Sequence, residues 1–398
     1  MSFIKTILIL VLFSHFSWSQ NLDMNDVTIL LPVPKPGEEN LLIKTLDVTR
    51  TGELLFPAEQ LFVGFELDVQ ERRTRSHQTD DFRVIGIRLD HFIRQLYINL
   101  VWQKPENGRI TKLASIHSTH TIFDLPIFLS KLEELNHKNR RRFPQGRLPL
   151  QVNPTIKAEG FNGPYFQELK KIVLSHIGPA FKVTFRSSRH SDGMSGFAGW
   201  ELPIHLNQPS VNQFAMIPEY QPGQEPFNNW QTYLPFTYLE VKNRLYSNIK
   251  TVGGFPPFAT KNFQPLIEDV DVSNTLSERE ILEMIGRVYM VENPRIIPGL
   301  VQTECLSCHF AQQVRIVTSR IRPHLPFEKF ADRMVFSSTQ YNTQNLNPVQ
   351  SSNFTIALGY ALNTPMWSQR VINETADTLE TIYGNRGVLT SVRTRGAH

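Results

Sequence analysis

Cysteine is nearly absent from this chain, which has two among its 398 residues, Cys305 and Cys308. A four-ligand structural zinc site is therefore disfavoured, because no second cysteine pair is present to close it. The chain also lacks a nucleotide-binding loop, a zincin motif and a paired-carboxylate pattern. The net charge of +4 is too small to indicate a nucleic-acid or membrane partner. The sequence therefore gives no indication of nucleotide-binding, zinc-protease or paired-carboxylate chemistry.

The two cysteines belong to the run Cys305-Leu306-Ser307-Cys308-His309. This spacing is typical of covalent attachment of a c-type haem, in which both thiols add to the vinyl groups of one porphyrin. The adjacent imidazole then becomes the proximal iron ligand. Chance would produce such a run with a probability on the order of one in several thousand. The alternatives are a disulfide, a redox pair or a metal site, and no βαβ pattern around the motif favours the redox pair.

The first residues are typical of an export signal. Lys5 is followed by an apolar run at 6–16 and then by Ser17-Trp18-Ser19-Gln20. Small residues at the last positions predict cleavage between Ser19 and Gln20. The run is too short to span a bilayer comfortably, and no other segment approaches the length of about eighteen apolar residues that a membrane helix needs. We therefore expect a signal peptide at 1–19 and a mature chain without a membrane span, in the periplasm or secreted.

Residues 20–240 combine two kinds of pattern. Alternating apolar and polar residues predict strands at 62–69, 82–89, 96–102, 110–120, 181–186, 199–206 and 213–218. Helical spacing predicts helices at 124–136 and 163–177. The class we expect is α+β, with an N-terminal mixed or antiparallel β domain that includes a few helices.

Residues 241–398 are expected to be mainly α-helical. Apolar residues at helical spacing predict helices at 238–249, 277–293, 312–321, 327–336 and 366–383. Ser277 and Glu280 have the spacing of a capping box, which fixes the start of the second of these helices. The order is a helix, the haem motif, loops and a terminal helix.

Residues 275–385 resemble a monohaem c-type cytochrome domain of class I. The resemblance is carried by Cys305, Cys308 and His309 and by the order of elements, and it covers a little over a quarter of the chain. The remainder resembles exported bacterial proteins that carry one such motif. The resemblance implies one covalent haem c, with thioethers to both cysteines and with His309 as the proximal ligand. The domains we expect are therefore 1–19, 20–240 and 241–398.

The sixth iron ligand is less well defined by the sequence. The resemblance implies a methionine on the loop before the terminal helix, and Met366 has that position. Thr364 and Pro365 look like the N-cap and first residue of the helix, which would place Met366 in the first turn. His324 is the second candidate and Met334 the third, although a core role suits Met334 better. His117, His120, His190 or an open site complete the alternatives.

The run His117-Ser118-Thr119-His120 contains two imidazoles that could hold a metal ion. On a strand, imidazoles three residues apart face opposite sides of the sheet, which disfavours a shared metal. His190 with Ser191 and Asp192 is an equally weak catalytic pattern.

The leading hypothesis from the sequence is a non-enzymatic exported protein that transfers electrons to a periplasmic redox partner. The alternative is a haem-stabilised binding or sensor protein, or a haem enzyme for small ligands with an open sixth position.

Overall fold

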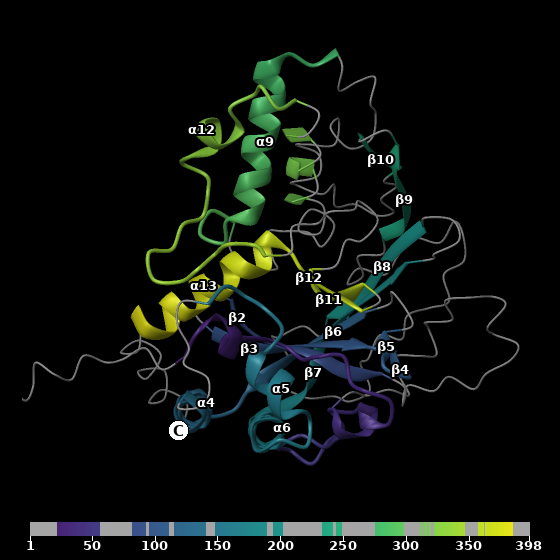
Figure 1. The fold of residues 1–398 in the computed structure, drawn as a ribbon, viewed down its shortest axis with the longest axis vertical. Coiled ribbons are helices and arrows are strands. Elements are labelled where there is room, and N and C mark those ends of the chain that lie inside the picture. Colours follow the sequence, from purple (N-terminus) through teal and green to yellow (C-terminus); the bar gives the residue numbers. More distant parts are fainter. Residues whose placement is uncertain are drawn as a thin grey trace, which may run out of the picture.

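The structure is a computed structural model that describes part of the chain. The described residues are 22–55, 82–92, 95–110, 115–140, 148–188, 194–201, 233–241, 244–248, 275–297, 311–312, 314–316, 318–319, 322–346, 357–361 and 363–384. They form a mixed α+β fold, in which an antiparallel sheet is followed by a mostly helical region with a small second sheet (Figure 1).

The main sheet has eight antiparallel strands in the order β1-β2-β3-β6-β7-β8-β9-β10. Their bounds are β1 Thr28–Leu30, β2 Arg83–Phe92, β3 Gln95–Gln103, β6 Ser115–Ile122, β7 Ile177–Ser188, β8 Met194–Glu201, β9 Tyr233–Val241 and β10 Arg244–Asn248. A hairpin of β4 (Pro105–Glu106) and β5 (Arg109–Ile110) follows β3. Its turn residues Asn107 and Gly108 have φ values of 52° and 74°, as a two-residue type I′ hairpin turn requires.

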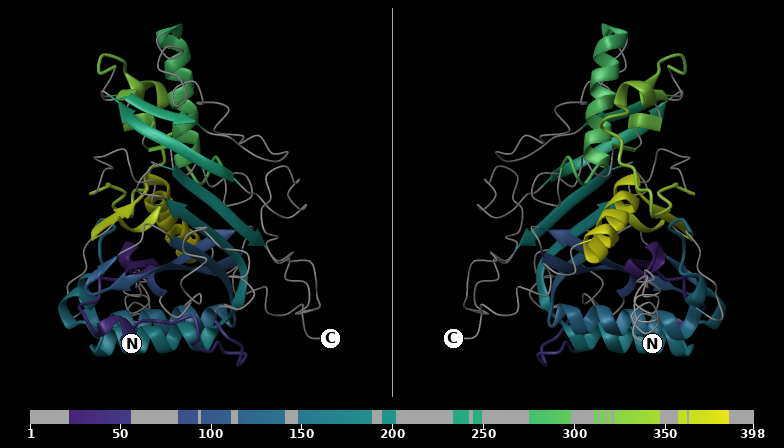
Figure 2. Two further views of the ribbon diagram at one scale, coloured as in Figure 1. Left: turned by 90° about the vertical axis from the view of Figure 1, so that its right-hand side faces the viewer. Right: turned by 90° about the vertical axis from the view of Figure 1, so that its left-hand side faces the viewer.

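Helices cover one face of this sheet. α4 (Leu125–Arg140) and α6 (Pro164–His176) lie side by side beneath the strands in both views of Figure 2. Their apolar faces, as predicted, include the buried Phe128, Leu132, Phe166 and Leu169. The short α5 (Pro154–Glu159) precedes α6, and the 3-10 turn η1 (Glu38–Leu41) lies between β1 and β2.

The opposite face carries α2 (Met24–Val27), α13 (Gln369–Gly384) and the hairpin of β11 (Leu358–Ala361) and β12 (Thr364–Trp367). Strand β3 is consequently buried along its whole length except for its first residue. Gly86 on β2 allows this close packing, because a Cβ there would lie 3.3 Å from Val101 and 3.4 Å from Leu358. We call the hydrophobic cluster formed by the sheet, α4, α6 and α13 the first core.

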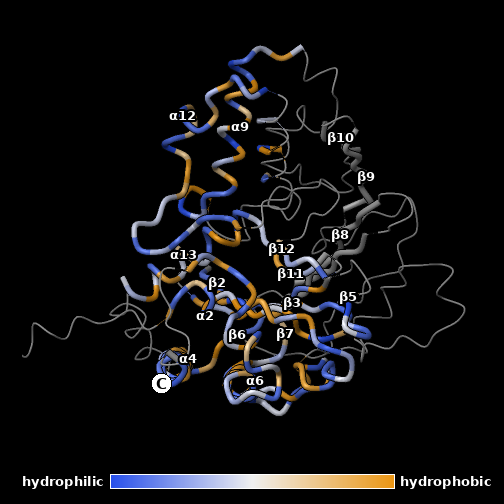
Figure 3. Tube along the Cα trace, in the orientation of Figure 1, coloured by the Kyte–Doolittle hydropathy of each residue, from blue (hydrophilic) through white to orange (hydrophobic). Residues whose placement is uncertain are grey.

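A second core lies around α9 (Glu278–Glu292) and α12 (Phe327–Ala331). It contains eleven buried residues: Ile281, Ile285, Val288, Tyr289, Val291, Ile297, Ala311, Val314, Leu325, Phe327 and Ala331. Figure 3 shows apolar residues alternating with polar ones along α9, as expected of a helix buried on one side. The capping box of Ser277 and Glu280 is confirmed, since both of its hydrogen bonds are present.

One predicted helix is wrong and others differ in length. Residues 238–249 were expected to be helical, but 233–241 and 244–248 form the β9–β10 hairpin, which pairs with β8. Short apolar runs fit both periods, and the pairing with β8 decides the outcome. The helix after His324 ends at Ala331 rather than at residue 336. The expected strands at 62–69 and 213–218 lie outside the described residues.

The first core draws on both of the expected domains. Strand β10 follows the boundary expected at residue 240, yet it extends the main sheet. Helix α13 was expected to close the haem domain, yet Val371, Leu379 and Ile382 on its buried face belong to the first core. The described parts of 20–240 and 241–398 therefore share one hydrophobic core.

Candidate functional site

The motif itself lies in a part of the chain that the structure does not describe. Cys305, Cys308 and His309 are therefore outside the described residues. His190 is also outside them, in a different part of the chain. The described chain stops at residue 297 and resumes at residue 311, so both flanks of the motif have defined positions. The candidate site is therefore built from these flanks and from Met366.

Met366 lies on strand β12, directly opposite Gly359 of β11. The expectation that it occupies the first helical turn is wrong, because α13 begins at Gln369. Thr364 and Pro365 are likewise strand residues, paired with β11, and do not cap the helix. Local sequence favoured a cap, but the cross-strand pairing, which a local pattern does not reveal, determined the backbone.

The Met366 side chain is buried, at 9% exposure, yet it belongs to neither core of the described residues. Alternation along β12 explains this, since the next residue, Trp367, faces the first core while Met366 points to the other side of the strand. Its cross-strand neighbour Gly359 has no side chain to cover it. The thioether is thus held on the side of the hairpin that faces away from the first core.

Polar contacts fix this hairpin to the main sheet. The Gln103 side chain at the end of β3 is completely buried, and its amide donates to the Tyr360 carbonyl at 2.9 Å and accepts from the Tyr360 N–H at 2.8 Å. The Tyr360 hydroxyl donates to the Leu31 carbonyl at 2.6 Å. Because Tyr360 of β11 is anchored through both its backbone and its side chain, these contacts hold the adjacent strand that carries Met366 against the main sheet.

The residues that follow the motif contact the start of α13. The side-chain carbonyl of Gln312 accepts a hydrogen bond from the backbone N–H of Gln369 at 2.8 Å. Ala311 and Val314, on either side of Gln312, are buried in the second core. Gln312 lies three residues after His309, and Gln369 lies three residues after Met366. The C-terminal flank of the motif is therefore adjacent to the segment that carries Met366.

The N-terminal flank is also attached to α13. The completely buried Arg370 donates to the carbonyl of Val291 at 2.7 Å and to that of Ile297 at 2.8 Å. Asn373 donates to the carbonyl of Glu292 at 2.9 Å. Such bonds satisfy carbonyls that the end of α9 leaves without helical partners. Both ends of the segment containing the motif therefore meet at the first two turns of α13.

An ion pair connects α9 with the residues after the motif. Glu292 at the end of α9 is buried, and its carboxylate lies 3.4 Å from Nε of Arg315. Burial raises the pKa of Glu292, and Arg315 opposes this shift. The guanidinium of Arg315 also stacks over the Tyr289 ring at 5.3 Å. This ion pair therefore links the end of α9 to the residues that follow the motif.

A second group of charges lies between the main sheet and α13. Arg88 on β2 pairs with Asp90 of the same strand and with Glu374 of α13, and Asn99 on β3 also donates to Asp90. Burial raises the pKa of Asp90 to about 6, despite the nearby Arg88. Burial acts on Glu374 too, but Arg370 and Arg88 lower its pKa below the usual value. These pairs fix α13 against the sheet.

The other ligand candidates have identifiable contacts. His324 is well exposed, and its Nε2 lies 3.0 Å from a carboxylate oxygen of Glu278. Met334 packs against the second core, as its predicted core role requires, and its sulfur lies 3.3 Å from where a Cβ on Gly286 would be. His324 therefore lies at the first turn of α9 and Met334 beside its middle, whereas Met366 is three residues from Gln369, which is bonded to the flank of the motif. Met366 therefore has the most suitable position among these three.

The sequence pattern of His117 and His120 did not identify Ser118 as the hydrogen-bond partner of His120. Ser118 and His120, two residues apart on β6, share a face, and Ser118 Oγ lies 2.7 Å from His120 Nε2. The indole of Trp102 donates to Ser118 Oγ at 2.7 Å, and His120 Nδ1 lies 2.9 Å from the Gly178 carbonyl. The alternation of strand residues could have revealed this pair. All four groups are buried in the first core, so the arrangement is a structural hydrogen-bond chain rather than a catalytic dyad.

Comparison of the chain with protein-family models, with curated proteins and with solved structures found no match. Within the described ranges, no group of three or more histidine, cysteine, aspartate or glutamate side chains has the arrangement of a metal site. Those ranges also contain no helix with the length and apolar character needed to cross a bilayer. The motif remains the strongest indication of function.

Proposed function

We propose that this protein is an exported monohaem c-type cytochrome that transfers electrons. The observation that carries the proposal is the run Cys305-Leu306-Ser307-Cys308-His309, whose spacing matches the chemistry of covalent haem attachment. The two cysteine thiols would form the thioethers and the His309 imidazole would be the proximal ligand. The bound haem would supply a one-electron ferric–ferrous couple.

The described residues on both sides of the motif support this proposal. A segment of three residues reaches at most about 11 Å, so ligation of one iron by His309 and Met366 is compatible with the bond between Gln312 and Gln369. The thioether of Met366 faces away from the first core. We therefore propose Met366 as the sixth ligand. We further propose that the cytochrome c-like part of the chain is limited to the second core and its flanks.

The protein's own residues would tune and protect the site. A thioether ligand favours the ferrous state and raises the reduction potential relative to a second imidazole. The ion pair of Glu292 and Arg315 and the anchoring of α9 by Arg370 would hold both flanks of the motif in fixed positions. The electron would pass to and from a redox partner protein in the periplasm.

Covalent attachment is tested by expressing the chain together with the c-haem maturation machinery. The denatured protein should retain haem on a gel, and its mass should exceed that of the cleaved chain by one haem. The double variant Cys305→Ala with Cys308→Ala should lose both signals. Two titratable free thiols in the native protein would overturn the proposal.

The sixth ligand is tested by the absorption spectrum of the oxidised protein. Met366→Ala should remove a far-red sulfur-to-iron charge-transfer band and shift the iron towards high spin. The matched control Met334→Ala should leave the spectrum intact. A low-spin spectrum that is lost in His324→Ala instead would assign the ligand to that histidine. A high-spin spectrum in the unmodified protein that shifts with added ligands would favour a sensor or a small-ligand enzyme.

A further inference from the structure

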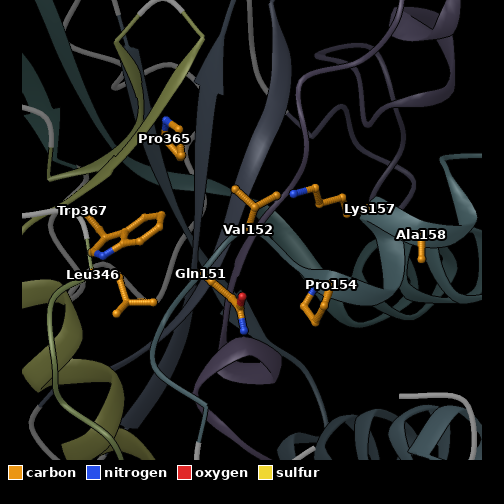
Figure 4. Close-up of a pocket in the computed structure, with 8 residues that line it drawn as sticks. All are labelled: Gln151, Val152, Pro154, Lys157, Ala158, Leu346, Pro365 and Trp367. Carbon is orange, nitrogen blue, oxygen red and sulfur yellow. The ribbon is translucent and has the colours of Figure 1, made fainter. Parts of the chain in front are cut away.

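An open pocket lies between α5 and the β11–β12 hairpin, on the side of β12 opposite to Met366 (Figure 4). Its volume is about 440 Å³, which is within the usual range for small-molecule sites. Eight residues line it: Gln151, Val152, Pro154, Lys157, Ala158, Leu346, Pro365 and Trp367. The residues before and within α5 provide one wall, and Leu346 and β12 provide the other.

The side chains that line this pocket are mainly apolar. Figure 4 shows the six-membered ring of the Trp367 indole pointing towards Val152 across the pocket, and the 3% exposure of this side chain means that only a small part of the ring borders the pocket. Pro365 and Pro154 present their rings from the two sides. Aromatic rings gain about 0.5–1.5 kcal/mol from stacking or edge contacts beyond simple burial. These walls therefore favour a planar apolar group.

One cation and one amide interrupt the apolar lining. Figure 4 shows the Lys157 side chain with its nitrogen directed towards Val152 and into the pocket. Among the ion pairs of the described residues, none includes Lys157. Gln151 adds an amide that can donate or accept a hydrogen bond. A single positive charge beside an apolar wall matches a ligand with one negative group.

We propose that this pocket binds a small aromatic monocarboxylate. The aromatic ring would lie between the two prolines, beside the exposed part of Trp367, and the carboxylate would pair with the Lys157 ammonium. This site is separate from the proposed haem site, because Trp367 and Met366 face opposite sides of β12. Binding there therefore does not depend on whether the protein carries a haem.

The proposal is tested by calorimetric titration of the full-length protein with two probes of the same shape. Phenylacetate carries the charge, and phenylacetamide is its neutral analogue. The unmodified protein should bind phenylacetate about three- to fivefold more tightly than phenylacetamide, as expected for a partly exposed ion pair. Equal affinity for the two probes, or no heat from either at millimolar concentration, would overturn the proposal.

Three variants identify the residues involved. Lys157→Met should reduce the affinity for phenylacetate to that for phenylacetamide and should leave the amide unchanged. Lys171→Met, at an exposed position on α6 outside the pocket, is the matched control and should change neither. Val152→Phe should fill the pocket and abolish binding of both probes without removing the Trp367 ring from the first core. If Lys157→Met and Lys171→Met bind phenylacetate equally well, the assignment of Lys157 as the partner of the carboxylate is wrong.

Discussion

The two cores differ in how they are enclosed. The first core lies between α4 and α6 on one face of the main sheet and α13 on the other, so β3 is buried on both sides. The second core rests on α9, the short α12 and a few residues after the motif. A small cluster of this kind buries less apolar surface and gains less free energy from burial. Among the residues that the structure describes, the region that flanks the motif therefore has the smaller hydrophobic cluster. This is the difference expected if a bound haem completes the second core.

Helix α13 belongs to both regions. Its buried face packs in the first core, while Arg370 and Asn373 bind the carbonyl groups at the end of α9. The charged group of Arg88, Asp90 and Glu374 fixes the same helix to the sheet. Within the described ranges, the second core is attached to the first through α13 and through the chain after α12, where Phe336 and Tyr341 are buried in the first core. The stabilities of the two cores should therefore be unequal but coupled.

If the protein carries the proposed haem, the largest expected effect is the loss of stability of the second core when that haem is absent. In the double variant Cys305→Ala with Cys308→Ala, amide hydrogens of α9 and α12 should exchange much faster than in the haem-loaded protein, because a group that binds only the folded state stabilises it. Those of β3 and β6 should remain protected. Hydrogen exchange followed by mass spectrometry measures both regions at once. Equal loss of protection in the sheet would show that the two cores unfold together.

The second effect concerns the contribution of α13 to the first core. Leu379 is completely buried there, so Leu379→Ala should lower the free energy of unfolding by about 2–5 kcal/mol. Leu346→Ala is the matched control, because its side chain is 48% exposed and should cost little. Denaturant unfolding followed by circular dichroism gives both values. A small effect of Leu379→Ala would mean that the sheet does not need α13. In that case residues 20–240 should also fold alone.

How much could be predicted from the sequence depended on the range of the determining interaction. The capping box of Ser277 and the apolar faces of α4, α6 and α9 were predicted correctly, because neighbouring residues determine them. The β9–β10 hairpin was not, because pairing with β8 decided its structure. Thr364 and Pro365 had the local pattern of a helix start, but β11 holds them in a strand. The same long-range pairing places α13 in the first core, and no local pattern reported this.

A third effect distinguishes the cores by pH. Burial lowers the pKa of His120 in the first core to about 4. In the unfolded chain the imidazole takes up a proton below about 6.5, whereas in the folded protein it stays neutral until about pH 4. The contribution of His120 to the free energy of unfolding is therefore complete above pH 6.5. It is lost as the pH falls from 6.5 to 4, and the loss is on the order of 3 kcal/mol. Denaturant unfolding at several pH values measures this loss, and His120→Gln should make it smaller. An unchanged pH dependence in that variant would assign the loss to other groups.

The smallest effect should be confined to the second core. The Ser277 hydroxyl accepts a hydrogen bond from the Glu280 N–H at 3.3 Å, and the Glu280 carboxylate accepts one from the Ser277 N–H at 2.8 Å. Ser277→Ala removes the first of these bonds and should destabilise α9 by about 1 kcal/mol. Ser337→Ala, in an exposed loop, is the matched control. Amide exchange in the first turns of α9 should become faster only in Ser277→Ala, while exchange in β3 should stay the same in both variants. Faster exchange in β3 as well would show that α13 transmits even a small local loss from the second core to the first.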